Sequence, residues 1–185
     1  MPGDLVQRAQ RGDHEAFDAL AGAAYDRLFA LAYRILRDAD RSQDAVQECL
    51  VHAWQDVRGL RDPGRFDAWL QRLLVNACYD ESRRRRQRSV EVHLLSLDRA
   101  APGNAADELA DRDQLERGFR RLPVEQRAVI VMHHYLGLRI PEIAETLGIP
   151  EGTVRSRLHY ATLAMRAVLE ADARPALVAA GGRTA

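Results

Sequence analysis

Apolar residues recur at three- and four-residue steps along most of the chain, which is the spacing of amphipathic helices. The first long stretch of this kind follows Asp13, a residue suited to capping a helix, and continues to Ile35. Two further stretches cover roughly residues 42–57 and 65–86, with a polar connector between them. The alternating pattern of strands is almost absent. The N-terminal part of the chain therefore predicts a helical domain.

The helical pattern stops over residues 89–106, where proline, glycine and small residues give no sustained period. We expect a flexible linker there, after an N-terminal domain of residues 1–88. Helical spacing resumes over residues 107–172, and residues 173–185, rich in alanine and glycine, predict a flexible tail. The sequence thus predicts an all-α protein in which two small helical domains are joined by a flexible linker.

The segment 141–158, PEIAETLGIPEGTVRSRL, has the spacing of a helix-turn-helix in the C-terminal domain. A short helix would end at Leu147, Gly148 and Ile149 would form the turn, and a longer helix would follow. Arg139 and Ile140 precede the short helix, so we expect it to lack a good N-terminal cap. In this motif the second helix enters the major groove of DNA.

One side of that second helix is apolar, and its opposite side and flanks are polar. No acidic residue stands between Glu151 and Glu170, so nothing there repels phosphate. Arginine, serine and histidine side chains can reach base edges or phosphates. Whether Arg155 reads bases or phosphates stays open. The candidate DNA-contacting residues of this helix are Thr153, Arg155, Ser156, Arg157, His159 and Tyr160.

The formal net charge of zero hides a segregated distribution. Acidic residues outnumber arginines in the first 82 residues, and residues 83–88 then add five arginines and no acid. Such a run predicts contacts with phosphates, because arginine neutralises the nucleic-acid backbone. Apart from histidine, every basic residue of the chain is an arginine, and there is no lysine.

Three motifs resemble those of bacterial RNA polymerase sigma factors. The stretch DAVQECLVHAW at 44–54 resembles the helix that docks on the clamp helices of the largest polymerase subunit. The stretch FDAWLQRLLVNACYD at 66–80 resembles the helix that engages the −10 element. Residues 122–157, from LPVEQR to GTVRSR, are similar to the domain that reads the −35 element. With these two domains alone, the chain is identified as a member of the extracytoplasmic-function (ECF, group IV) sigma factors.

The resemblance implies a role for individual residues. Polymerase binding would use Asp44, Gln47 and Glu48, and the −35 element would be read by the six candidates of the last helix. The resemblance matches Arg72 and Asn76 to polar positions that read the −10 element, and it matches the connector 58–65 to a loop that receives a flipped base. Gln71 departs from the aromatic residue often found at its position. The expected −10 contacts are Arg65, Arg72, Asn76, Arg83, Arg84, Arg85 and Arg86.

The same resemblance implies the partners and the class of activity. It implies binding to core RNA polymerase and promoter DNA, and control by an anti-sigma factor whose identity the sequence does not reveal. We expect no enzymatic activity, no cofactor and no metal. The beginning of the chain has no secretory pattern and no apolar run approaches a membrane span, so we expect a cytoplasmic protein without membrane insertion.

Two alternatives come from the residues themselves. A stand-alone regulator with the same helix-turn-helix would bind duplex DNA without polymerase, and the motif at 44–54 argues against it. An enzyme with a metal in its N-terminal domain would rest on Cys49 and His52 alone, and a zinc site needs about four ligands. We expect Cys49 and Cys78 to pack in the core as small apolar residues.

Overall fold

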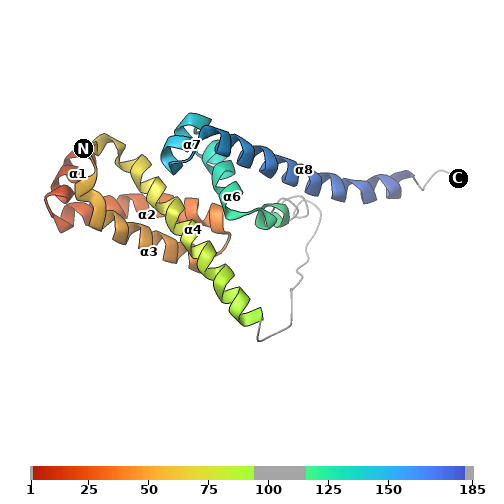
Figure 1. Cartoon of the computed structure of the whole chain (residues 1–185), viewed down its shortest axis with the longest axis horizontal. Helices are drawn as coiled ribbons and strands as arrows, with labels where there is room; N and C mark the ends of the chain where they lie inside the picture. The colour runs from red at the N-terminus through yellow and green to blue at the C-terminus, as the bar shows by residue number, and fades with distance from the viewer. Residues whose placement is uncertain (1, 94–115, 182–185) are drawn as a thin grey trace.

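The computed structural model describes residues 2–93 and 116–181 (Figure 1). Within these ranges every regular element is a helix or a helical turn, and no strand occurs. The elements form two halves, one N-terminal and one C-terminal, as the sequence predicted. The all-α class is therefore confirmed.

The N-terminal half begins with three helices: α1 (Pro2–Gln10), α2 (His14–Leu36) and α3 (Ala39–Asp56). The periodicity did not predict α1, which is short and buries only Val6 and Ala9. Asp13 caps α2 as expected, because its side chain accepts a hydrogen bond from the Ala16 N–H at 3.0 Å.

The break between α2 and α3 lies at the predicted position but is shorter than predicted. Arg37 adopts a left-handed conformation with φ 57°, and its N–H donates to the Tyr33 carbonyl. The next residue, Asp38, caps α3 by accepting from the Arg41 N–H. This cap starts α3 at Ala39, before the position near Ser42 that the apolar pattern indicated.

Two short 3₁₀ turns, η1 (Val57–Gly59) and η2 (Pro63–Arg65), lead into the long helix α4 (Phe66–His93). α4 packs on α2 and α3 and completes the core of the N-terminal half. It continues past the predicted end near Arg86, because no glycine or proline follows until Pro102. The first part of the expected flexible linker, 89–93, is therefore helical. The rest of that segment lies outside the described residues.

The C-terminal half consists of helical residues 116–121 and four further elements. These are α6 (Val124–Ile130), the π-helical turn η3 (Val131–Tyr135), α7 (Ile140–Leu147) and α8 (Glu151–Gly181). α8 includes residues 173–181, which we expected to be a flexible tail. Alanine-rich sequence favours helix, and this preference outweighs the low apolar periodicity that suggested a tail.

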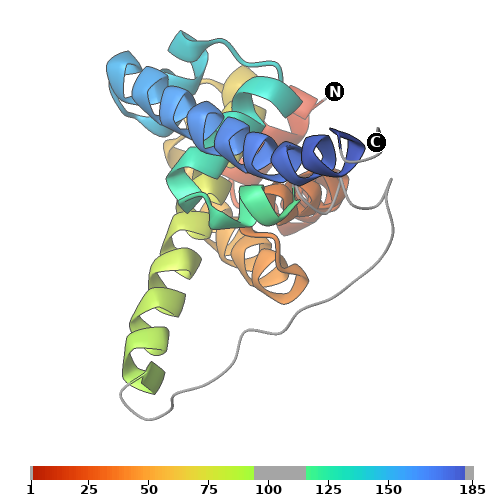
Figure 2. The ribbon, with the colours of Figure 1, turned by 90° about the vertical axis from the view of Figure 1, so that its right-hand side faces the viewer.

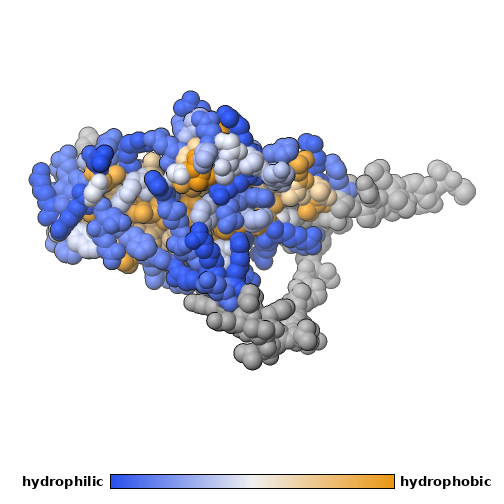
Figure 3. Space-filling model, in the orientation of Figure 1, coloured by the Kyte–Doolittle hydropathy of each residue, from blue (hydrophilic) through white to orange (hydrophobic). Residues whose placement is uncertain are grey.

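The two halves pack against each other. α6 and α7 lie on α4, and α6 and η3 contact α2, so that one continuous apolar cluster runs through both halves (Figures 1 and 2). At this junction the Arg34 guanidinium stacks 3.8 Å from the centre of the Tyr135 ring. Most of the face shown in Figure 3 is hydrophilic, with hydrophobic residues in small patches. The sequence did not predict this contact between the halves.

Candidate nucleic-acid and polymerase interfaces

α7, the turn at Gly148 and α8 form the predicted helix-turn-helix. Gly148 has φ 65°, a left-handed conformation that glycine adopts without steric cost. The Ile149 N–H donates to the Ala144 carbonyl at 3.1 Å, which closes the end of α7. α8 then starts on the Pro150 carbonyl, which accepts from the Thr153 N–H at 2.9 Å. The local sequence thus sets the angle at which α8 leaves the turn.

The N-terminus of α7 is better capped by hydrogen bonds than the sequence indicated. The Glu142 carboxylate accepts from the Arg139 backbone N–H at 2.7 Å and from its guanidinium at 2.9 Å. These bonds lower the pKa of Glu142 and bind the carboxylate at the positive end of the helix. Our expectation of a poor cap considered only the residues before the helix, and here the side chain of the first turn reaches back.

α8 packs by the side that its periodicity predicted. Val154 and Ala161 are fully buried, and Leu158 and Met165 are partly buried against the cluster. The opposite side is open to solvent, with Arg155, Ser156, His159 and Tyr160 exposed. Insertion into the major groove requires a helix whose one side is anchored on the core and whose opposite, polar side is exposed.

The exposed candidates of α8 are held only by local contacts. Arg155 pairs with Glu151 one turn earlier at 2.8 Å, and the Ser156 hydroxyl donates to the Thr153 carbonyl at 3.0 Å. The His159 and Tyr160 rings meet edge to face with centroids 5.6 Å apart. None of these contacts ties the face to the other half of the molecule.

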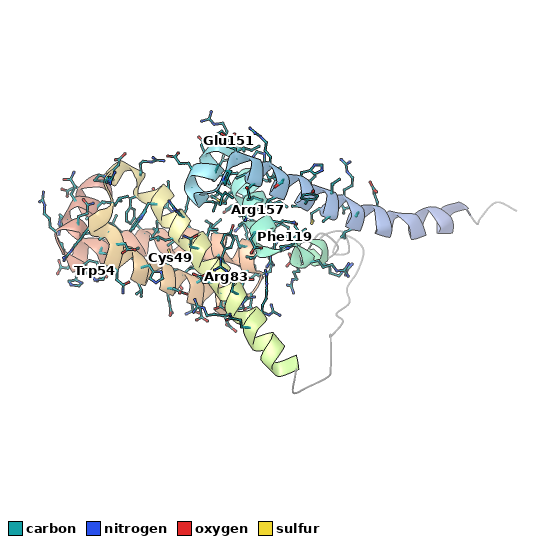
Figure 4. All side chains as sticks on the ribbon, viewed as in Figure 1. Cys49, Trp54, Arg83, Phe119, Glu151 and Arg157 are labelled. Atoms are coloured by element: carbon teal, nitrogen blue, oxygen red, sulfur yellow. The ribbon has the colours of Figure 1, made fainter. Side chains whose placement is uncertain are left out.

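Thr153 and Arg157 differ from the other four α8 candidates because both are half-buried. Arg157 lies at the junction of the halves, near Tyr79 of α4 (Figure 4). The structure therefore brings four of the six candidates to one open face and directs Arg157 toward the N-terminal half.

The candidate polymerase-binding residues lie along one stripe of α3. Asp44 and Gln47 are exposed, and Glu48 is half-buried. Val51 continues the stripe one turn further and is 55% exposed, which adds an apolar side chain to this polar surface. We did not single out Val51 from the sequence, although its spacing of seven residues from Asp44 was a usable signal.

Glu48 and Arg84 were assigned to different partners, yet they form an ion pair with each other. The Glu48 carboxylate raises the pKa of Arg84 further above its ordinary value. Arg84 also approaches Glu81, which pairs with Arg41 at 3.2 Å in a largely buried position. Arg84 thus belongs to a network that ties α4 to α3, which the sequence did not predict.

The −10 candidates fall into three groups. Asn76, Arg83 and Arg85 are exposed on α4, and Arg83 pairs with Asp80, one turn away. Arg84 pairs with acids of the N-terminal half. The other three contact the C-terminal half. Arg65 pairs with Glu145 at 2.8 Å, Arg86 lies 3.8 Å from Glu125, and the Arg72 guanidinium lies against Gly148.

Two aromatic residues lie on the same stripe of α4 as Arg72 and Asn76. Trp69 is half-buried, and its ring centre lies 5.8 Å from that of Phe66, which indicates a packing role. Burial raises the pKa of Tyr79 to about 12, and the positive charge of Arg157 opposes that shift. The buried Tyr79 hydroxyl lies close to the Arg157 side chain, but no hydrogen bond of ordinary length and angle forms there among the described residues.

The geometry gives no support to a metal site at Cys49 and His52. Cys49 is fully buried and its thiol faces the Leu70 carbonyl at 3.6 Å, whereas His52 is exposed on another side of α3. Burial raises the pKa of Cys49 to about 12, which disfavours the thiolate that binds metals. Cys78 is also fully buried, so both thiols pack in the core as predicted.

The fold and these surfaces define a helix-turn-helix protein with a second, separate helical half. Two family models match the chain: Sigma-70 region 2 over residues 20–88, and Sigma-70 region 4 over residues 112–165. The chain is 38% identical over 160 residues to the ECF RNA polymerase sigma factor SigL of Mycobacterium tuberculosis. That match covers 82% of this chain and 90% of the relative. The chain therefore belongs to the ECF sigma factors, the proteins that give RNA polymerase its promoter recognition.

Solved structures agree with this fold. One is the structure of CnrH in complex with the cytosolic domain of CnrY, with a TM-score of 0.62 and 27% identity over 92% of this chain and 98% of that chain. Another is the sigma factor RpoE in complex with the anti-sigma factor NepR from Bartonella quintana, with a TM-score of 0.64. Its 23% identity over 84% of this chain and 98% of that chain supports the fold alone. In the described part of the chain, no helix has the length and apolar character of a membrane span.

Proposed function

We propose that this chain is a group IV sigma factor that docks on core polymerase through α3 and reads the −35 and −10 elements through α8 and α4. The proposal is carried by one observation: the polar face of α8 is open, free of acids between Glu151 and Glu170, and anchored from behind by the core. We also propose that the N-terminal domain ends near residue 88 and that the C-terminal domain begins near residue 107.

The −35 element would be read as duplex DNA. The first turns of α8 present Arg155 and Ser156 at the open face, where hydrogen-bond donors can meet base edges in the major groove. His159 and Tyr160 follow one turn later and would contact the flanking backbone. Since the face makes only local contacts, reading needs no rearrangement of α8.

Polymerase binding would use the α3 stripe of Asp44, Gln47, Glu48 and Val51. A carboxylate and an amide beside an exposed valine suit a partner helix that is basic and partly apolar. The ion pair with Arg84 holds Glu48 at the edge of this stripe. Glu48 would then act partly by fixing α3 on α4.

The −10 element would be read as a separated strand on α4. The Asn76 amide is exposed and can bond to a base edge, and the exposed Arg83 and Arg85 can neutralise phosphates. Arg84 is a weaker candidate for DNA contact than we expected, because two carboxylates already bind it.

A sigma factor is an initiation factor and not an enzyme, and we propose no cofactor for this chain. CnrH and RpoE were both solved with a bound partner, CnrY and the anti-sigma factor NepR respectively. By that likeness we propose that an anti-sigma factor holds this chain inactive. We also propose that it acts in the cytoplasm, where polymerase and promoter DNA are found.

Run-off transcription tests the function directly. Purified core polymerase, genomic promoter fragments and the full chain should give start sites that core polymerase alone does not give. A chain that adds no start site, while core polymerase responds to another sigma factor, would contradict the proposal.

A charge reversal tests the docking surface. Asp44→Arg places a cation on the α3 stripe at an exposed position and should lower the affinity for core polymerase by about 10-fold or more. The matched control is Asp18→Arg on the exposed side of α2, which should bind as the original chain does. Equal affinities of the two variants would remove Asp44 from the interface.

A further inference from the structure

The first helix, α1, lies outside both matched family regions, and the apolar pattern did not predict it. It nevertheless packs against η1 and η2, the two turns that connect α3 to α4 (Figure 1). Val6 and Ala9 pack in the core, and an ion pair of 2.7 Å between Arg8 and Asp13 joins the end of α1 to the N-terminal cap of α2. α1 is therefore fixed on the domain beside the connector 58–65.

Gln10, the last residue of α1, bonds to the backbone at the start of the connector. Its Nε2 donates to the Val57 carbonyl, just before the connector, at 3.1 Å and to the Leu60 carbonyl within it at 2.6 Å. Because a carbonyl only accepts, the side-chain amide must direct its two N–H donors at these two oxygens. One side chain thus holds two points of the backbone that are three residues apart.

The connector has few other contacts that could fix its shape. Arg58, Gly59 and Arg61 are exposed, and nothing lies within 4 Å of a Cβ built on Gly59. Val57 is anchored in the core before this stretch, and Asp62 caps η2 after it. In the described part of the chain, no other side chain from outside the connector bonds to its backbone. The path of the chain between the two anchors therefore depends mainly on Gln10.

The backbone that Gln10 holds borders a cavity beside the proposed −10-reading residues. The cavity has a volume of about 290 Å³, with Leu60 and Arg61 on its connector side. Trp69 and Arg72 of α4 line another side, and residues of α7 also border it. An apolar side chain, an aromatic ring and guanidinium groups suit an unpaired base and its phosphate. Gln10 therefore fixes one wall of a cavity that suits a base.

We propose that Gln10 is a positioning residue for promoter recognition: its two hydrogen bonds hold the connector in the shape that receives an unpaired base of the −10 element. This inference rests on the proposed function, because it takes the connector and α4 as the −10-reading surface. A loop that is already ordered loses less free energy on binding and keeps its groups aligned with one base. The inference adds that α1 sets how sharply that base is distinguished from the others.

Hydrogen exchange on the full chain tests the positioning. Gln10→Met keeps the length of the side chain and removes both donors, so the amides of residues 58–65 should exchange about 3- to 10-fold faster. The matched control is Gln7→Met at an exposed position of the same helix, which should leave that exchange unchanged. Gln10→Asn, one methylene shorter, provides a milder change should Gln10→Met disturb α1, and circular dichroism checks the helical content of each variant.

Base selectivity of the holoenzyme joins the positioning to recognition. The probe is a fluorescent single strand with the non-template −10 sequence of a promoter mapped by run-off transcription, and strands with one base changed at a time compete for it. Gln10→Met should reduce the preference at one −10 position by about 3- to 10-fold and leave the salt slope of binding unchanged. Gln10→Lys, which restores a donor, should recover part of that preference.

The outcomes separate this inference from the proposed function. Unchanged connector exchange in both Gln10→Met and Gln10→Asn, or unchanged base preference in a variant whose connector exchanges faster, would overturn the inference. A loss of preference that Gln10→Lys shares in full would assign the loss to the packing of α1 and would overturn it as well. A holoenzyme of the original chain that shows no −10 base preference and no run-off transcription would instead contradict the proposed function.

Discussion

The two surfaces proposed to read DNA differ in how far their residues already pair with other parts of the chain. The α8 face presents Arg155, Ser156 and His159 to solvent, and its contacts stay within one helix. Of the −10 candidates, Arg65 in η2 and Arg86 on α4 pair with acids of the other half. The α8 face is therefore free to meet DNA as it stands, whereas these two arginines would have to exchange an internal carboxylate for a phosphate.

Charge explains why the two surfaces differ. The α8 face lacks acids between Glu151 and Glu170, so its arginine finds only Glu151. Arg84 and Arg86 of α4 and Arg65 of η2 pair with Glu48, Glu125 and Glu145, which come from three other helices. An internal acid competes with phosphate for the same guanidinium. These three arginines should therefore bind phosphate less readily than an unpaired arginine would.

The largest expected effect concerns the open surface. Arg155→Ala should weaken binding to a −35 duplex by about 1–3 kcal/mol, or about 5- to 150-fold, because the variant loses a guanidinium proposed to contact the DNA directly. Fluorescence anisotropy with cognate and altered duplexes measures this, and Arg166→Ala on the exposed end of α8 is the control. Loss at the cognate sequence alone identifies Arg155 as a base reader. Equal loss on all sequences, with a smaller salt slope, identifies a phosphate contact.

The next largest effect is expected at the turn between α7 and α8. Gly148→Ala should destabilise the fold by about 1–2 kcal/mol, because an alanine is strained at φ 65° and its Cβ would meet Arg72. Gly152→Ala is a control of opposite sign: Gly152 lies within α8 with open space around its Cβ, so alanine should stabilise the helix slightly. Urea denaturation measures both. A Gly148→Ala protein as stable as the original would contradict the geometry of the turn.

A smaller effect, an increase in stability, is expected at the junction between the two halves. Arg127→Met replaces a buried cation for which the described residues show no ion pair, and should stabilise the packing of the two halves by about 1 kcal/mol. The urea midpoint should rise. Arg121→Met, at an exposed position of the same half, is the control. Destabilisation by Arg127→Met would show that the guanidinium is satisfied in the folded protein.

The smallest effect concerns Tyr79. Its pKa is raised to about 12 by burial, so the folded chain holds the phenol proton more tightly than the unfolded chain does. Stability from this group is complete below pH of about 10 and falls as the pH rises toward about 12. Tyr79→Phe should remove that loss and change stability at neutral pH by less than about 1 kcal/mol, since the hydroxyl makes no hydrogen bond of ordinary geometry among the described residues. Ultraviolet titration should show the last tyrosine transition disappear. A variant that keeps it would assign the high pKa to another tyrosine.

Local features of the chain were predictable because local physics decides them. Asp13 and the break at Arg37 follow from capping and from the end of an apolar period, and the turn at Gly148 follows from the need for a left-handed residue. The same reasoning failed where a single signal was weak. α1 was missed because it buries little, and the ends of α4 and α8 were placed too early because charged or alanine-rich sequence carries no apolar period.

The sequence by itself determined the helices, the helix-turn-helix and the set of residues able to meet polymerase or DNA, since these depend on neighbours within a few positions along the chain. Only the tertiary structure decided which of those residues are free. Glu48 pairs with Arg84 and Arg65 pairs with Glu145, through contacts between elements far apart in sequence. The Arg127 Nε is buried without a hydrogen-bond partner in the part of the chain that the structure describes. Charge pairing across a packed junction depends on where whole helices come to lie, and no local pattern encodes that placement.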